Sequence, residues 1–275
     1  MGKSLGRILT RLVLGLSAME KPWRRADTRL RVSEALVPRQ RIDTRHGPLF
    51  FVTAHPQALQ YPRDFETREP ETLAWIDAFE TPCSFWDIGA NVGVFTLYAG
   101  LRPGIEVRAF EPAAASYAAL CRNIEANALA DRVQAYCVAL GDRTLLGRLN
   151  LSATNAASVF NAFDSTTDCF GEEIEIVFRQ GMLGFSIDEF RRLFRLPAPN
   201  YLKIDVDSTE ERILAGASET LRAPDLRSVL IELERASTTR NDRLAAAFAA
   251  AGLTLALRCE GNQEGIVNAI FTRAD

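Results

Sequence analysis

The nine residues from Phe85 to Gly93, which read F-W-D-I-G-A-N-V-G, constrain the fold more than any other segment of the chain. They join a short apolar run to the helix-like stretch 95–101 through a turn that contains Gly89 and Gly93. Small residues in a turn between a strand and a helix let the backbone approach a bound ligand closely. The segment predicts an α/β fold in which this loop binds a nucleotide-like cofactor; a turn that merely connects strand and helix is the alternative.

Asp87 distinguishes this loop from the dinucleotide-binding fingerprint. That fingerprint begins with glycine and has the spacing G-x-G-x-x-G, whereas this loop has the spacing D-x-G-x-N-x-G, with Asn91 inside it. A carboxylate at the entrance of the loop would repel a pyrophosphate and attract a cation. S-adenosylmethionine, a sulfonium compound with a cationic amino group, fits better than NAD. We therefore assign Asp87, Gly89, Asn91 and Gly93 to binding of this cofactor.

Two further acidic residues follow predicted strands. Glu111 ends the predicted strand 107–111 and lies 24 positions after Asp87, close to the offset of roughly 20 residues at which nucleotide folds place an acid that binds ribose. Asp142 follows the predicted strand 133–140, where its side chain could accept a hydrogen bond from an adenine amino group. The alternative for Asp142 is a turn-forming role after a strand.

Charges alternate along the predicted strand 201–207, which places Lys203, Asp205 and Asp207 on one side. A strand between helices should be apolar on both faces, so these charges are costly unless they pair or line a cavity. We predict that Asp205 is the catalytic base, that Lys203 pairs with it or orients the acceptor, and that Asp207 and Glu232 are further candidates. One alternative is a Lys–Asp ion pair at the end of the strand with a purely structural role. A Mg²⁺ site formed by Asp205, Asp207 and Glu232 is the other alternative, although we assign no metal ligands.

Together these motifs resemble the FkbM-type S-adenosylmethionine-dependent methyltransferases. The matching segments, in the family's order and spacing, are 85–93, 109–112, 139–142, 186–188, 202–207 and 231–233. The resemblance covers roughly residues 70–235 and implies a class I methyltransferase fold and methyl transfer, usually to a hydroxyl oxygen of a sugar or natural-product scaffold. One departure is Ser208, which stands where the family usually has glycine, while Glu210 is kept. The turn that shapes the acceptor pocket therefore departs from the family pattern.

We expect residues 69–275 to form a Rossmann-like, seven-stranded, mostly parallel sheet with helices on both faces. An antiparallel hairpin formed by 253–258 and 266–272 should close it. We also expect a helix over 113–127, a helix over 209–221, and a capping box at Ser186 that makes Asp188 structural. The polar segment 153–171 is predicted to belong to the acceptor pocket.

Residues 1–68 are expected to form an N-terminal extension with an amphipathic helix, a loosely structured connector over 21–45, and a strand within 46–55. The apolar side chains of the helix recur at helical spacing, whereas Lys3, Arg7 and Arg11 lie on its other side. Through residues 3–16 such a helix can lie on an anionic membrane surface, dock on the body of the protein, or form a contact in a homo-oligomer.

Composition narrows the function further. A net charge of −3 argues against a general nucleic-acid binder, which needs a basic surface. The five cysteines are scattered and contain no C-x-x-C pair, which favours a reducing, cytoplasmic setting without a metal–thiolate site. His46 and His55 are expected to be surface or structural residues. We expect an O-methyltransferase for a small-molecule or glycan acceptor; the rivals are a catalytically silent binding protein and a nicotinamide oxidoreductase.

Overall fold

The computed structural model describes residues 2–53, 55–157, 161–166, 173, 175–206, 209–260 and 265–273. These residues divide into two compact units, residues 1–39 and residues 40–275. The first unit is a hairpin of the helices α1 (Gly2–Ala18) and α2 (Pro22–Ala35). The prediction of an amphipathic helix near the N-terminus is confirmed by α1.

The prediction that residues 21–45 are loosely structured is wrong. Residues 22–35 form α2, and Arg39–Thr44 forms strand β1. Pro22 lies in the first turn of α2, where its missing N–H costs no helical hydrogen bond. The arginines that follow are good helix formers, and Arg31 pairs with Asp27 one turn earlier.

The second unit is built on a seven-stranded sheet, which confirms the predicted fold class. Its strand order is β12-β13-β11-β10-β3-β4-β5. All neighbouring strands are parallel except β13, which is antiparallel to both β11 and β12 and forms the predicted closing hairpin. The strands are β3 (Cys83–Ile88), β4 (Ile105–Phe110), β5 (Val133–Tyr136), β10 (Tyr201–Ile204), β11 (Ser228–Glu234), β12 (Leu253–Glu260) and β13 (Ile266–Arg273).

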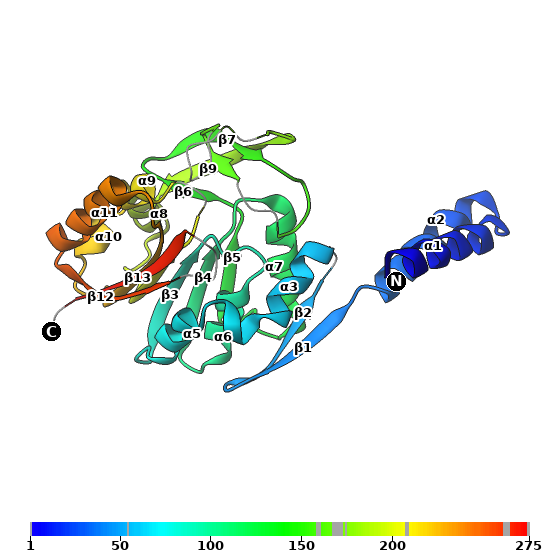
Figure 1. Cartoon of the computed structure of the whole chain (residues 1–275), viewed down its shortest axis with the longest axis horizontal. Helices are drawn as coiled ribbons and strands as arrows, with labels where there is room; N and C mark the ends of the chain where they lie inside the picture. The colour runs from blue at the N-terminus through cyan, green and yellow to red at the C-terminus, as the bar shows by residue number, and fades with distance from the viewer. Residues whose placement is uncertain are drawn as a thin grey trace. The chain divides into compact units, whose positions relative to one another are not determined.

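Helices cover both faces of this sheet, as Figure 1 shows. One face carries α5 (Pro70–Asp77), α6 (Val94–Leu101) and α7 (Ala114–Ala126); the other carries α8 (Ile187–Phe194), α9 (Glu210–Ala215), α10 (Ser218–Arg222) and α11 (Thr238–Ala250). Successive strand residues point to opposite faces. Phe85 and Tyr201 therefore pack into the first core, while Trp86 and Leu202 pack into the second.

The strand β2 (Gly47–Val52) pairs with β1 and is anchored on α7. The side chain of Asn127 both accepts a hydrogen bond from the Phe50 N–H (2.8 Å) and donates one to the Phe50 carbonyl (2.7 Å). Short helices then lead toward α5: η1 (Pro56–Leu59), α3 (Gln60–Arg63) and α4 (Phe65–Arg68). Residues 40–68, assigned from the sequence to the extension, thus share a compact unit with the sheet.

A second sheet has the order β6-β9-β7-β8. Its strands are β6 (Ala139–Gly141), β7 (Leu145–Leu151), β8 (Ala162–Phe163) and β9 (Phe178–Ser186). The prediction of one strand over 133–140 is wrong, because the run divides between the sheets. β5 pairs with β4, whereas β6 pairs in parallel with β9. Apolarity alone predicts that such a run is buried, but not which strand it pairs with.

Local signals after the second sheet agree with the structure. The hydroxyl of Ser186 accepts a hydrogen bond from the Glu189 N–H (3.1 Å), which confirms the capping box at the start of α8. Asp188 accepts hydrogen bonds from the N–H groups of Glu219 and Thr220 and is structural, as predicted. The predicted helix 209–221 is divided into α9 and α10 at Gly216. None of the helices in the described parts of the chain is long and apolar enough to cross a membrane.

Candidate active site

The carboxyl ends of β3, β4 and β10 meet at a cleft with a cavity volume of about 170 Å³. Strand order reverses between β3 and β10, and open α/β sheets bind ligands at such a switch point. Seven of the residues predicted from the sequence line the cleft: Asp87, Gly89, Asn91, Glu111, Lys203, Asp205 and Glu232. Gly93 and Asp142 are not among the lining residues, and Asp207 lies outside the described residues.

Gly89 is required by the close approach of two strands. Its φ angle is +84°, and a Cβ atom there would lie 1.7 Å from the carbonyl oxygen of Asp205. The N–H groups of Gly89 and Ala90 both donate to the carbonyl of Phe110 (3.0 and 3.1 Å). Gly93 serves packing, because its missing Cβ leaves room for the side chain of Leu120. The loop is therefore fixed against the ends of β4 and β10.

Two buried acceptors of the loop have no hydrogen-bond partner among the described residues: Oδ1 of Asp87 and Oδ1 of Asn91. Buried polar atoms are nearly always paired, so such orphans at a cleft point to a ligand that brings donors. The other Asp87 oxygen accepts a 2.5 Å hydrogen bond from the Thr96 hydroxyl, and the Asn91 amide donates to the Tyr61 hydroxyl (3.1 Å). Both side chains are held by one end and leave an acceptor for the ligand.

Glu111 holds the loop in place. One carboxylate oxygen accepts a hydrogen bond from the Asn91 N–H (2.9 Å), and the other accepts one from the Ala113 N–H (2.8 Å). Asn91 has a left-handed backbone with a φ of 49°, which is uncommon outside glycine and costs on the order of 1–3 kcal/mol unless the surroundings fix it. The carboxylate of Glu111 is thus one of the groups that stabilise the loop conformation.

Replacing Glu111 with glutamine should weaken cofactor binding. The amide keeps one acceptor oxygen but presents an NH₂ group to the second backbone N–H, which leaves a buried donor unpaired at a cost of about 1–3 kcal/mol. We expect Glu111→Gln to raise the Kd for S-adenosylmethionine by about 10- to 100-fold, measured by isothermal titration calorimetry. Glu125→Gln, on the exposed side of α7, is the matched control. An unchanged Kd in Glu111→Gln would contradict this role.

Lys203 is the centre of a buried ionic cluster at the floor of the cleft. The sheet register places it directly beside Asp87 of the neighbouring strand. Its ammonium group forms an ion pair with Asp205 and lies 4.9 Å from the centre of the Phe95 ring. Burial by itself lowers the pKa of Lys203, but the carboxylates of Asp205, Glu69 and Asp87 together raise it above the usual value. Lys203 is therefore a permanent cation and is unsuited to accept a proton.

Burial has the opposite effect on the carboxyl groups of this cluster, because it disfavours their charged form by raising the pKa. Burial raises the pKa of Asp87, and the Lys203 ammonium and the Thr96 hydroxyl offset part of that rise. Burial likewise raises the pKa of Glu69; Lys203 opposes the shift and Asp205 adds to it. Clusters in which titratable groups have strongly perturbed pKa values are more frequent in active sites than elsewhere.

Glu69 is the functional candidate that the sequence did not reveal. It precedes α5, and its carboxylate accepts hydrogen bonds from the Thr72 hydroxyl (2.9 Å) and the Asn268 amide (3.4 Å). In the sequence it reads as an acid at the start of a helix, just before Pro70, where acids are common for reasons of helix polarity. Only the fold brings it to Lys203. No linear signal identifies it.

Asp142 occupies a different environment. Its carboxylate pairs with the guanidinium group of Arg212 at 2.8 and 3.0 Å. Burial raises the pKa of Asp142, but the hydrogen bonds it accepts and the charges of Arg212 and Arg143 together lower it below its usual value. A contact between Asp142 and an adenine amino group stays a prediction, and it would use an oxygen that Arg212 leaves available.

The described residues contain no group of three or more His, Cys, Asp or Glu side chains that could hold a metal ion. Of the acids considered for Mg²⁺, Asp205 and Glu232 line the cleft, whereas Asp207 is outside the described residues.

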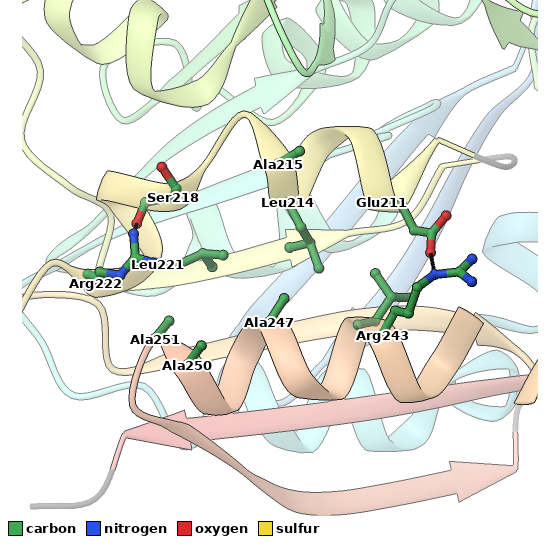
Figure 2. A pocket seen from close by; sticks show the side chains of 11 residues that line it. Glu211, Leu214, Ala215, Ser218, Leu221, Arg222, Arg243, Ala247, Ala250 and Ala251 are labelled. Carbon is green, nitrogen blue, oxygen red and sulfur yellow. Dashed lines mark hydrogen bonds and ion pairs between the residues drawn. The ribbon is translucent and has the colours of Figure 1, made fainter. Parts of the chain in front are cut away.

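A second hollow, of about 340 Å³, lies between α11 and the pair α9 and α10 (Figure 2). Its walls consist largely of alanine and leucine side chains, and an ion pair between Glu211 and Arg243 (2.8 Å) crosses one end. It contains neither the glycine loop nor the buried ionic cluster. We therefore place the candidate active site in the smaller, charged cleft.

Comparison with known proteins identifies the family. A sequence model of the Methyltransferase FkbM domain matches residues 87–252, which is more than half of the chain. The chain belongs to the FkbM methyltransferase family. The family is one of S-adenosylmethionine-dependent methyltransferases, as the sequence predicted.

Individual relatives are more distant. The 31-O-demethyl-FK506 methyltransferase FkbM of Streptomyces tacrolimicus is 29% identical over 167 residues, covering 54% of this chain and 64% of that protein. A solved structure of methyltransferase FkbM from Methylobacillus flagellatus KT has 14% identity and a TM-score of 0.48, and covers 79% of this chain and 55% of that chain. An S-adenosylmethionine-dependent methyltransferase from Agrobacterium tumefaciens has 12% identity and a TM-score of 0.49, with coverages of 86% and 70%.

Proposed function

We propose that this FkbM family member methylates a hydroxyl oxygen of a sugar, a glycan or glycolipid precursor, or a secondary metabolite. The observation that carries the proposal is that one cleft holds both the cofactor loop and the buried cluster of Lys203 and Asp205. The name of the Streptomyces relative describes methylation of an oxygen, which supports the reaction class. Because the matched region spans only 64% of that relative, its substrate is not assigned to this chain.

The loop residues suit the cofactor. The unpartnered oxygens of Asp87 and Asn91 can accept hydrogen bonds from its ammonium group. Glu111 borders the same cleft, where a carboxylate can bind ribose hydroxyls. Gly89 keeps the backbone of the loop close to the ligand. Gly93 and Asp142, which do not line the cleft, remain candidates, Asp142 for the adenine end. When bound, S-adenosylmethionine supplies an electrophilic methyl group on a cationic sulfur.

The protein must then orient the acceptor and remove its proton. An alcohol is a weak nucleophile at neutral pH, so a positioned base contributes typically about 10²–10⁴-fold. The Asp205 side chain is 29% exposed in the cleft, whereas Lys203 is buried behind it. We assign proton acceptance to Asp205 and its orientation to Lys203. Asp207 and Glu232 keep their places as further candidates, and Glu69 joins them because of its raised pKa.

Replacing Asp205 with asparagine should lower turnover about 10²–10⁴-fold, because the amide cannot accept the proton. Binding of S-adenosylmethionine should change only a few-fold, since Asp205 acts on the acceptor. Single-turnover kinetics and calorimetry separate these two effects. If Glu69 is the base instead, Glu69→Gln will lose turnover and Asp205→Asn will retain it. If EDTA lowers the turnover of the wild-type enzyme as much as Asp205→Asn does, the metal-dependent reaction is favoured.

Comparison of extracts from cells with and without the protein tests the proposed function directly. Extracts are incubated with the enzyme and S-adenosylmethionine that carries a deuterated methyl group, and labelled products are found by mass spectrometry. A labelled methyl ether supports O-methylation, whereas a labelled amine or thioether would refute it. A catalytically silent protein would bind the cofactor and give no product. Thermal stabilisation by NAD but not by S-adenosylmethionine would favour the oxidoreductase.

We also propose a cytoplasmic, reducing location. The four described cysteines, Cys83, Cys121, Cys137 and Cys259, are free thiols. Burial raises the pKa of Cys83 to about 11, which suppresses its reactive thiolate form.

A further inference from the structure

The hairpin of α1 and α2 carries more than half of the large hydrophobic side chains that are exposed in the described parts of this protein. Eighteen large hydrophobic side chains are exposed among the described residues, and ten of them lie between residues 5 and 36. Five of the ten share one face of α1 by their spacing and are 51–66% exposed: Leu5, Ile8, Leu9, Leu12 and Leu16. Contiguous exposed apolar surface generally marks a site of interaction.

This leucine face, defined as those five side chains, is not what joins the two helices. The contact between α1 and α2 uses other positions of α1: Ser17 is buried and accepts a hydrogen bond from the side chain of Arg29 (2.8 Å), and Val13 is half-buried. On α2, no described residue is buried. The hairpin therefore forms without covering its leucine face.

The charge of the hairpin identifies the partner. Residues 1–39 contain nine lysines and arginines and three acidic residues, a net charge of +6, whereas the whole chain has −3. A second copy of the hairpin would carry the same charge and be repelled. Trp23 is 72% exposed, with the Lys21 ammonium 5.4 Å from its ring centre. Tryptophan beside basic residues is typical of segments at a bilayer interface.

We propose that the hairpin binds the surface of an anionic lipid bilayer. The leucine face enters the boundary between headgroups and acyl chains, and the basic side chains contact acidic headgroups. This is peripheral binding, since neither helix is long and apolar enough to span a bilayer. Binding depends on the hairpin alone and not on the proposed acceptor, so vesicle binding and methyl transfer can fail independently.

Flotation of the full chain with vesicles tests the proposal. One set of vesicles is phosphatidylcholine, and the other contains about one third phosphatidylglycerol. We expect the partition coefficient to be at least about 10-fold higher on the anionic set and to fall as salt is added. The double variant Leu9→Ser, Leu12→Ser should lower it at least about 10-fold, and Arg7→Gln, Arg11→Gln should lower it about 10- to 30-fold.

Matched controls carry the same changes on the other unit. Leu146→Ser, Leu193→Ser removes two exposed leucines of that unit, and Arg122→Gln, Arg258→Gln removes two exposed charges; both should bind vesicles like wild type. Equal binding to both vesicle sets, or to neither, would overturn the proposal. So would a dimer in light scattering that Leu9→Ser, Leu12→Ser dissociates. A loss of melting temperature in that variant with unchanged vesicle binding would instead show that the leucine face docks on the body of the protein.

Discussion

Replacing Gly89 with alanine is expected to abolish cofactor binding and to destabilise the second unit, residues 40–275. The added methyl group would overlap the carbonyl oxygen of Asp205 at 1.7 Å, and the residue has a φ of +84°. Left-handed backbone costs an ordinary residue about 1–3 kcal/mol, and overpacking costs a similar amount, so we expect a total loss of about 2–6 kcal/mol. Urea denaturation measures this loss, and calorimetry with S-adenosylmethionine measures the loss of binding.

The conflicting atom explains why the effect should be large. A flexible side chain could move away, but the Asp205 carbonyl belongs to the backbone at the end of β10, and the Asp205 N–H is bonded to the Ile88 carbonyl (3.0 Å). Relief of the overlap must therefore separate β3 from β10 at the cleft. Gly181→Ala is the control, because a Cβ atom there has nothing within 4 Å. Wild-type affinity and stability in Gly89→Ala would refute the geometry described for the loop.

Replacing Lys203 with methionine should destabilise the protein by about 3–5 kcal/mol, since loss of one partner leaves buried charge uncompensated. The variant would retain Asp87 and Glu69, whose carboxyl groups Lys203 now stabilises in their charged forms. Denaturant titration gives the free energy of unfolding. As control, Arg192→Met removes an exposed ion pair with Glu219 (3.2 Å) and should cost less than about 1 kcal/mol.

The destabilisation by Lys203→Met should also depend on pH in a definite direction. Asp87 and Glu69 already have raised pKa values, and loss of Lys203 raises them further. A carboxyl group with a raised pKa in the folded state contributes stability at low pH, and this contribution is lost as pH rises through that pKa. The difference in unfolding free energy between wild type and Lys203→Met should therefore shrink from about pH 8 to about pH 5. A difference that widens on acidification would contradict the cluster.

Local sequence patterns predicted most of the sheet and the position of the loop. The predicted closing hairpin is formed by β12 and β13, and the predicted helix 113–127 differs from α7 by one residue at each end. The wrong predictions occur where a local sequence pattern does not indicate which strand a segment pairs with. Residues 133–141 divide between two sheets because Ala139 pairs with Gly184 of β9, a partner distant in sequence.

The sequence by itself determined the family, and it predicted a cofactor site at the loop from Asp87 to Gly93 and at Glu111, because glycines and acids at strand ends are local requirements of backbone and charge. Only the tertiary structure decided which charges meet. Glu69 reaches Lys203 from the position just before α5, and Asp87 lies beside Lys203 only through the register of β3 and β10. Electrostatic energy depends on distance in space and on burial, and neither quantity can be obtained from positions along the chain.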